Sequence, residues 1–144
     1  MIKDWGVMRG RTLLAFIALA AWLAAVPALA HHSFAAEFDE NKPVKFTGKI
    51  TGMKWSNPHS WLYVDVEQNG KVVNWAFETG AGVNSLFRRG WRKEDLPVGA
   101  VVTVEGWQAR NGKPVANSRS VRLADGRTLF AGTSNRNDPT SREQ

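Results

Sequence analysis

The sequence contains no cysteine, and this absence narrows the chemistry that the chain can perform. Disulfide bonds, a cysteine nucleophile and a lipid anchor on an N-terminal cysteine are all excluded. A folded domain must therefore be stabilised by packing alone. Tryptophan and phenylalanine, with seven residues each, supply the large side chains for a core.

Motifs of the common enzyme classes are also missing. The sequence has no G-x-S-x-G elbow, no H-E-x-x-H pair and no phosphate-binding glycine loop. Four acidic residues stand without recognisable partners in sequence: Glu37, Asp39, Glu78 and Glu105. We therefore expect a protein that is not an enzyme.

Charge of one sign is not concentrated anywhere along the chain. The formal net charge is +6, yet no five basic residues are consecutive. Scattered bases of this kind are typical of an ordinary solvated surface, so we expect no nucleic-acid partner.

The one long apolar run lies near the N-terminus, from Leu13 to Val26. It is shorter than the ~20 residues of a membrane-spanning helix, it follows three basic residues, and it ends at Ala28-Leu29-Ala30. These features predict a signal peptide over residues 1–30, with a mature protein that starts at His31 and keeps no transmembrane segment. Arg9 and Arg11 are not adjacent, so the general secretory route into the periplasm is expected.

Apolar and polar residues alternate through most of the remaining chain, which predicts strands. Asn69-Gly70 is a strong hairpin signal between strands 61–68 and 71–78. If Gln68 faces Lys71, one face of this hairpin is wholly apolar, with Leu62 opposite Phe77. Further strands are expected over 44–52, 101–107, 115–123 and, shorter, 127–130.

One short helix is expected over residues 85–89, with Asn84 as its N-cap and Gly90 at its end. Three strands, a helix and two strands is the element order of the OB fold. We therefore predict an all-β domain, a small five-stranded OB-type barrel over residues 31–132. Residues 31–42 would form an N-terminal arm, and residues 133–144 a disordered tail.

Loops at the mouth of such barrels usually contact the ligand, and here they are rich in aromatic and polar side chains. Trp61 and Tyr63 would suit stacking on a sugar or another flat ligand. A simpler alternative is that Trp55 and Trp61 cover one end of the barrel. The predicted ligand-binding residues are Trp55, Asn57, Trp61, Tyr63, Glu78 and Arg110.

All three histidines are candidate metal ligands: His31 and His32 at the expected mature N-terminus, and His59 in a loop. An N-terminal histidine offers its amine and its imidazole, a nitrogen set that copper(II) favours. The alternative is an untethered His-His start and a loop histidine that bonds the backbone. Possible cofactors thus include copper, but the spacing does not define a site.

Several segments together resemble an uncharacterised family of small exported proteins of Gram-negative bacteria. They are the His31-His32-Ser33-Phe34 start, the Trp55-Ser56-Asn57-Pro58-His59 loop, Asn74-Trp75-Ala76-Phe77-Glu78, Arg88-Arg89-Gly90-Trp91 and Leu123-Ala124-Asp125-Gly126-Arg127. The family looks like a domain of unknown function, so the resemblance implies periplasmic residence and a role for the shared residues, but no activity. Three functions remain open: a binding or accessory module for a small ligand, a copper carrier, or a structural protein that meets another envelope protein.

Overall fold

A computed structural model describes residues 34–132, and most of them lie in β-strands. The expected signal peptide, His31, His32 and the C-terminal tail lie outside the described residues. The elements in chain order are α2 (Phe34–Glu37), β1 (Phe38–Lys54), β2 (Trp61–Gln68), β3 (Lys71–Thr79), α3 (Val83–Arg88), a 3-10 helix (Lys93–Asp95), β4 (Val101–Ala109), β5 (Val115–Leu123) and β6 (Thr128–Phe130).

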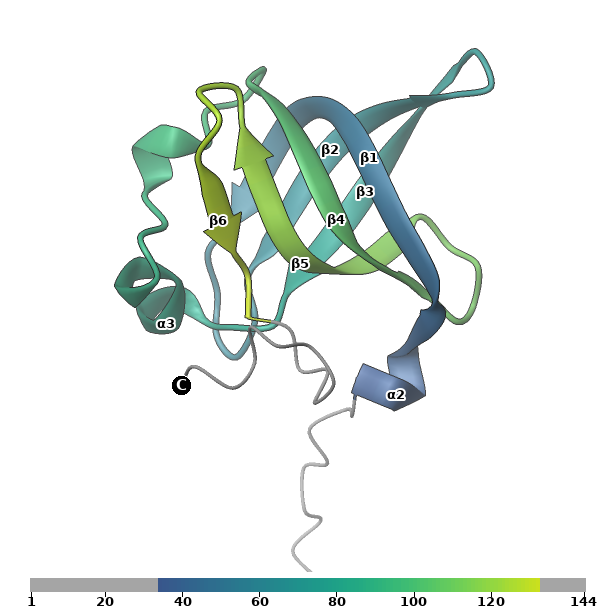
Figure 1. The fold of residues 1–144 in the computed structure, drawn as a ribbon, viewed down its shortest axis with the longest axis horizontal. Helices are drawn as coiled ribbons and strands as arrows, with labels where there is room; N and C mark the ends of the chain where they lie inside the picture. The colour runs from purple at the N-terminus through teal and green to yellow at the C-terminus, as the bar shows by residue number, and fades with distance from the viewer. Residues whose placement is uncertain (1–33, 133–144) are drawn as a thin grey trace, which may run out of the picture. The chain divides into compact units, whose positions relative to one another are not determined.

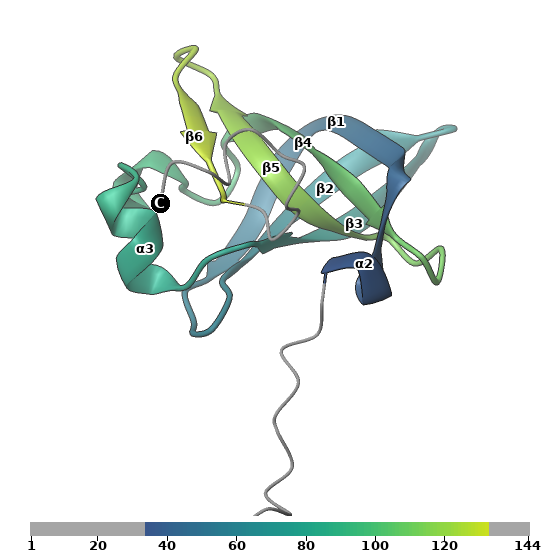
Figure 2. The same cartoon turned by 60° about the horizontal axis from the view of Figure 1, so that its bottom comes forward.

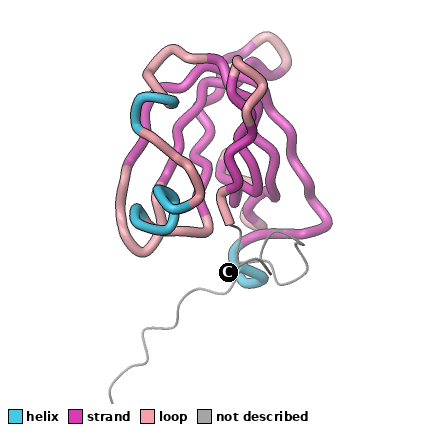
Figure 3. Tube along the Cα trace, turned by 60° about the vertical axis from the view of Figure 1, so that its left-hand side comes forward, coloured by secondary structure: helices cyan, strands magenta, loops and turns pink. Residues whose placement is uncertain are grey.

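The strands form one six-stranded sheet in the order β3-β2-β1-β4-β5-β6 (Figure 1). Neighbours in this order run antiparallel. Strand β5 makes one further pairing, parallel to β3, from Ala76 opposite Val115 to Thr79 opposite Ser118. The helices lie at the margins of the strands (Figure 3). The β-rich fold predicted from the sequence is confirmed.

The β2–β3 hairpin has the predicted register. Gln68 faces Lys71 and Leu62 faces Phe77. The turn residues Asn69 and Gly70 have φ values of 51° and 74°, the left-handed conformation that a type I′ turn requires. The apolar face of the hairpin is buried in the core, as the register predicts.

Strand β1 is longer than the predicted 44–52 and bends along its length (Figure 1). A register shift between Ile50 and Gly52 interrupts its pairing with β2. At Gly48 a Cβ atom would lie 2.1 Å from the backbone oxygen of Asp65, so the strands approach too closely there for any side chain. The two glycines thus permit the bend, as expected from their position inside a strand.

Helix α3 differs from its prediction at the N-terminus. The helix spans Val83–Arg88, and Gly82 rather than Asn84 is its N-cap. No side chain of the helix caps it; instead Oδ1 of Asn57, in the β1–β2 loop, accepts the Val83 N–H at 3.1 Å. The prediction of an Asn84 cap was wrong because a distant loop satisfies the N–H that a local cap would bind. Gly90, with φ 88°, follows the helix as predicted.

The stretch interpreted as an N-terminal arm contains α2 and the start of β1. Phe34 packs edge-on against Trp107 at 5.5 Å between ring centroids, and tilted against Phe38 at 5.7 Å. These rings form a small apolar cluster separate from the main core, together with Ala109 and Val115. Figure 2 shows α2 below β5 and β3, well separated from α3. Among residues 34–132, no helix has the length and apolar character needed to cross a membrane.

Candidate functional site

His59 projects from a tightly bonded loop between β1 and β2. The Ser56 hydroxyl donates to the His59 carbonyl oxygen at 2.7 Å, and the Ser60 hydroxyl donates to the Ser56 carbonyl oxygen at 3.1 Å. Ser60 is completely buried, and the Asn57–Pro58 peptide bond is cis. The two hydroxyl hydrogen bonds hold the backbone of the loop on both sides of His59.

The His59 imidazole contacts a buried carboxylate. Its Nδ1 atom is hydrogen-bonded to Oε1 of Glu78, near the end of β3. The Glu78 side chain is 10% exposed and the His59 side chain 29% exposed. Because an ionised carboxylate only accepts, Nδ1 carries the proton of this bond, and Nε2 is the ring nitrogen that the bond to Glu78 does not use. Within residues 34–132, Nε2 makes no hydrogen bond.

Glu78 raises the pKa of His59 above its ordinary value of 6.5. The hydrogen bond from the imidazole is the largest cause, and partial burial opposes it. The charges of Glu78 and of Glu37, on α2, add smaller upward contributions. Helix α2 therefore lies close enough for its carboxylate to act on the imidazole.

Asn117, on β5, extends this polar region across the sheet. It pairs with Glu78 on β3 and with Trp107 on β4, so the three side chains share one face. Asn117 is 1% exposed, and its Oδ1 has no hydrogen-bond partner among the described residues. Such an unpaired buried acceptor is rare and is satisfied when a donor, such as a water molecule or a ligand group, reaches it.

Two of the predicted ligand-binding residues support the packing of α3. The Trp55 ring lies against Phe87 at 5.3 Å between centroids. Asn57 accepts the Val83 N–H, and its Oδ1 atom would be 2.2 Å from a Cβ at Gly82. The alternative in which Trp55 covers one end of the domain agrees with these contacts.

Trp61 and Tyr63 lie half-buried on the face opposite the core. Trp61 is opposite Glu78 and Tyr63 is opposite Ala76, as the hairpin register predicts. Trp61 is therefore the aromatic neighbour of the His59–Glu78 pair, whereas Tyr63 lies two residues further along the strand.

Arg110, in the β4–β5 loop, holds α2 in place. Its Nε donates to the Ala35 carbonyl oxygen at 2.8 Å, and its backbone N–H donates to the Glu37 carbonyl oxygen at 2.9 Å. Its guanidinium also lies 4.0 Å from the Asp39 carboxylate. The β4–β5 loop thus contacts the helix that carries Glu37.

The structure describes one of the three histidines that were predicted as metal ligands. His31 and His32 lie outside the described residues, and within residues 34–132 no group of three His, Cys, Asp or Glu side chains could hold a metal ion. His59 is the one predicted metal ligand that the structure places.

The sequence did not predict helix α2, and it did not predict that Asn117 lies beside Glu78 at the site. The four-residue spacing of Phe34 and Phe38 is a helical signal, but the segment is too short for a periodic pattern. Nothing in the sequence marks Asn117, because its neighbours Glu78 and Trp107 come from strands far apart in the chain.

Comparison with known protein families yields a match over most of the chain. Residues 19–118 match the model of a family described as a family of unknown function (DUF6152). No curated protein and no solved structure matches the chain.

Proposed function

Because the chain belongs to this family of unknown function, we propose a function from its geometry: it is an exported, non-enzymatic binding module with its ligand site at His59. The observation that carries this proposal is the His59–Glu78 pair. A carboxylate that is 10% exposed holds an imidazole that is 29% exposed, and the bond between them leaves Nε2 as the ring nitrogen for a ligand. Burying a carboxylate is costly, and here the bonded imidazole offsets that cost.

The pairing pattern supports an OB-type barrel for this module. Pairings β1–β2, β2–β3, β3–β5, β5–β4 and β4–β1 return to the strand from which they began. In OB folds the loops after the first and fourth strands contact the ligand. Here the first of these loops carries His59 and the second carries Arg110, and α2 interacts with both residues.

Export to the periplasm is part of the proposal. It rests on the basic start, the apolar run and the Ala28-Leu29-Ala30 ending of residues 1–30. Cleavage after Ala30 would place a free amine on His31.

Recovery of the processed protein from its own cells tests the proposal. Native wild type and His59→Ala would be analysed for bound metals and small molecules by mass spectrometry. We expect a ligand with wild type that is reduced in the variant. Equal ligand content in the two proteins would contradict a site at His59.

Copper(II) binding is the second candidate, and a specific observation favours it. Histidines that ligate metals usually donate their other ring N–H to a carboxylate, which orients the ring and increases its basicity. His59 has this arrangement, with Nδ1 on Glu78 and Nε2 as the atom that would bind the metal. Copper(II) has the highest affinity of the common divalent metals for such nitrogen donors.

The remaining ligands would come from His31 and His32. Only Ser33 separates His32 from α2, which Arg110 and Trp107 hold in place. An extended chain spans about 3.3–3.6 Å per residue, so three residues reach at most roughly 11 Å from Phe34. The amine and ring of His31 could thus join His59, with His32 as a further donor.

Copper titration of three processed proteins tests this candidate: wild type, His59→Ala, and a form with one additional residue before His31. Both changes are expected to weaken copper binding, since each removes one part of the shared site. If His59→Ala binds copper as tightly as wild type, the shared site does not exist and any copper is held by the terminus alone.

A further inference from the structure

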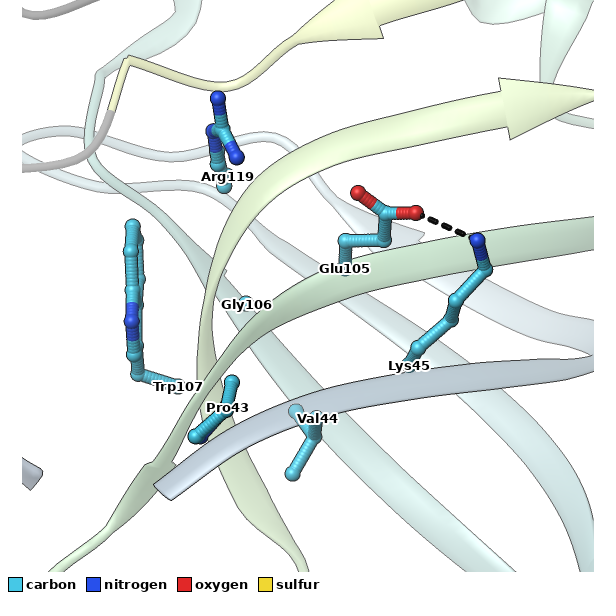
Figure 4. A pocket seen from close by; sticks show the side chains of 7 residues that line it. All are labelled: Pro43, Val44, Lys45, Glu105, Gly106, Trp107 and Arg119. Carbon is cyan, nitrogen blue, oxygen red and sulfur yellow. Dashed lines mark ion pairs between the residues drawn. The ribbon is translucent and has the colours of Figure 1, made fainter. Parts of the chain in front are cut away.

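A hollow lies on the outer surface of the sheet, and His59 is not among the residues that line it. It has a volume of about 370 Å³ and is formed over β1, β4 and β5 (Figure 4). This volume is at the lower end of the range for small-molecule sites, which suits one ring rather than a large cofactor. Its lining residues are Pro43, Val44, Lys45, Glu105, Gly106, Trp107 and Arg119.

The floor and one wall of the hollow offer an apolar surface. Trp107 stands up from β4 beside Gly106, with Pro43 near its foot (Figure 4). A side chain at Gly106 is impossible, because its Cβ would be 2.0 Å from the Asn117 backbone oxygen. The absence of that side chain lets the backbone of β5 approach β4 closely beside Trp107. Phe34 packs edge-on against Trp107 and fixes the orientation of the ring.

A β-bulge supplies the charged part of the hollow. Glu105 pairs with Ser120 while Gly106 pairs with Ser118, so Arg119 is the extra residue of β5. Bulges re-aim side chains, and here Arg119 lines the hollow instead of alternating into the core. It contributes a guanidinium with five N–H donors, enough to bind a carboxylate in addition to the interaction that Arg119 already makes in the protein.

The local charge favours an anion. The Glu105 carboxylate is neutralised by the Lys45 ammonium at 2.8 Å. Lys45, Arg119 and the neighbouring Arg122 lower the pKa of Glu105, so their combined field is positive at this carboxylate. A second hollow of about 240 Å³ shares Glu105 and Arg119 and includes Arg122, which continues the basic surface toward β6.

We propose that the hollow at Trp107 binds the ring of an acidic sugar, with the flat face of the ring on the indole and its carboxylate on Arg119. The apolar face of a pyranose suits an aromatic wall, and the carboxylate suits a bulged arginine beside a neutralised acid. A neutral sugar would use only the wall, and inorganic phosphate only the guanidinium. The inference is independent of the His59 site.

Calorimetric titration tests this inference. The processed protein is titrated separately with sodium D-glucuronate, trigalacturonate, D-glucose and inorganic phosphate. We expect glucuronate to bind at least about tenfold more tightly than glucose or phosphate. Tighter binding of trigalacturonate than of glucuronate would identify a polymer as the source of the ring; the reverse order would identify a free sugar acid. Phosphate binding equal to glucuronate binding would overturn the proposal.

Substitutions of Trp107 and of Arg119 test the two proposed ligand contacts separately. Trp107→Leu should weaken glucuronate binding roughly tenfold, which corresponds to about 1.4 kcal/mol of lost stacking. Arg119→Gln should abolish the preference for glucuronate over glucose and leave the fold intact, so the test does not depend on the stability of the tryptophan variant. Lys71→Gln, which removes one exposed positive charge at the start of β3, is the matched control and should bind like wild type. Equal loss in Lys71→Gln and Arg119→Gln would reduce the effect to net charge and overturn the proposed contact. His59→Ala should leave glucuronate binding unchanged.

Discussion

Replacement of Trp75 by alanine should destabilise the domain far more than replacement of Trp61. Both residues lie in the β2–β3 hairpin, but Trp75 is 4% exposed in the core whereas Trp61 is half-buried on the opposite face. The Trp75 ring packs against Phe46 at 4.5 Å and Phe77 at 6.0 Å between centroids. The comparison therefore tests the face assignment of the hairpin.

The size of the Trp75 effect follows from three losses. Removal of a buried tryptophan side chain usually costs about 3–5 kcal/mol, from lost burial and from the cavity that remains. The indole N–H also donates to Oε1 of Gln68 at 3.0 Å, and a bond of this kind contributes about 1 kcal/mol. Against a typical stability of about 5–15 kcal/mol, such a loss removes a large fraction of the free energy of unfolding.

Urea denaturation followed by far-UV circular dichroism measures both variants without reliance on tryptophan fluorescence. Trp75→Phe is the intermediate variant, because it keeps an aromatic ring in the core and loses the indole hydrogen bond. We expect the order of stability wild type, Trp61→Ala, Trp75→Phe, Trp75→Ala. Equal losses for Trp61→Ala and Trp75→Ala would refute the assignment of the two faces.

Two further predictions concern the candidate site and the bend of β1. In metal-free protein, His59 should titrate above 6.5, and Glu78→Gln should lower its pKa, as measured by NMR of the imidazole protons. Since the raised pKa favours the protonated folded state, the stabilisation is complete below pH 6.5 and is lost as the pH rises through the folded-state pKa; a pH-independent stability difference between wild type and Glu78→Gln would contradict the ion pair. Gly48→Ala should destabilise the domain by about 1–3 kcal/mol in thermal unfolding, because its Cβ would overlap a backbone oxygen at 2.1 Å. Gly52→Ala is the control, since its nearest neighbour would be 3.9 Å away; similar losses for both glycines would refute the steric explanation.

The two surface regions differ in what they offer a ligand. The His59 site presents one imidazole nitrogen backed by a buried carboxylate. The hollow at Trp107 presents an aromatic face and a guanidinium. Phe34 contacts the Trp107 wall, and α2 also carries Glu37, which acts on His59. The position of α2 therefore affects both regions, and the variants above separate them.

Local signals in the sequence were sufficient for the hairpin and for the extent of β5. Asn69-Gly70 favours one turn type, and that turn together with the alternation of apolar residues leaves a single register with a buried face. The strand predicted over 115–123 matches β5 because the turn signals Asn111-Gly112 and Asp125-Gly126 flank it in the sequence. The stop of α3 before Gly90 was likewise predictable from one residue.

Only the tertiary structure decided how these elements meet. The parallel pairing of β3 with β5 places Asn117 beside Glu78, and the Arg119 bulge exists only relative to β4. Asn57 binds the start of α3 across 26 residues, which no local cap rule anticipates. The physical reason is that alternation along a strand determines which side chains are buried, whereas the choice of the neighbouring strand depends on contacts between distant segments. The His59–Glu78 pair shows both levels: the sequence determined the face of Glu78, and the folded loop brought the imidazole to it.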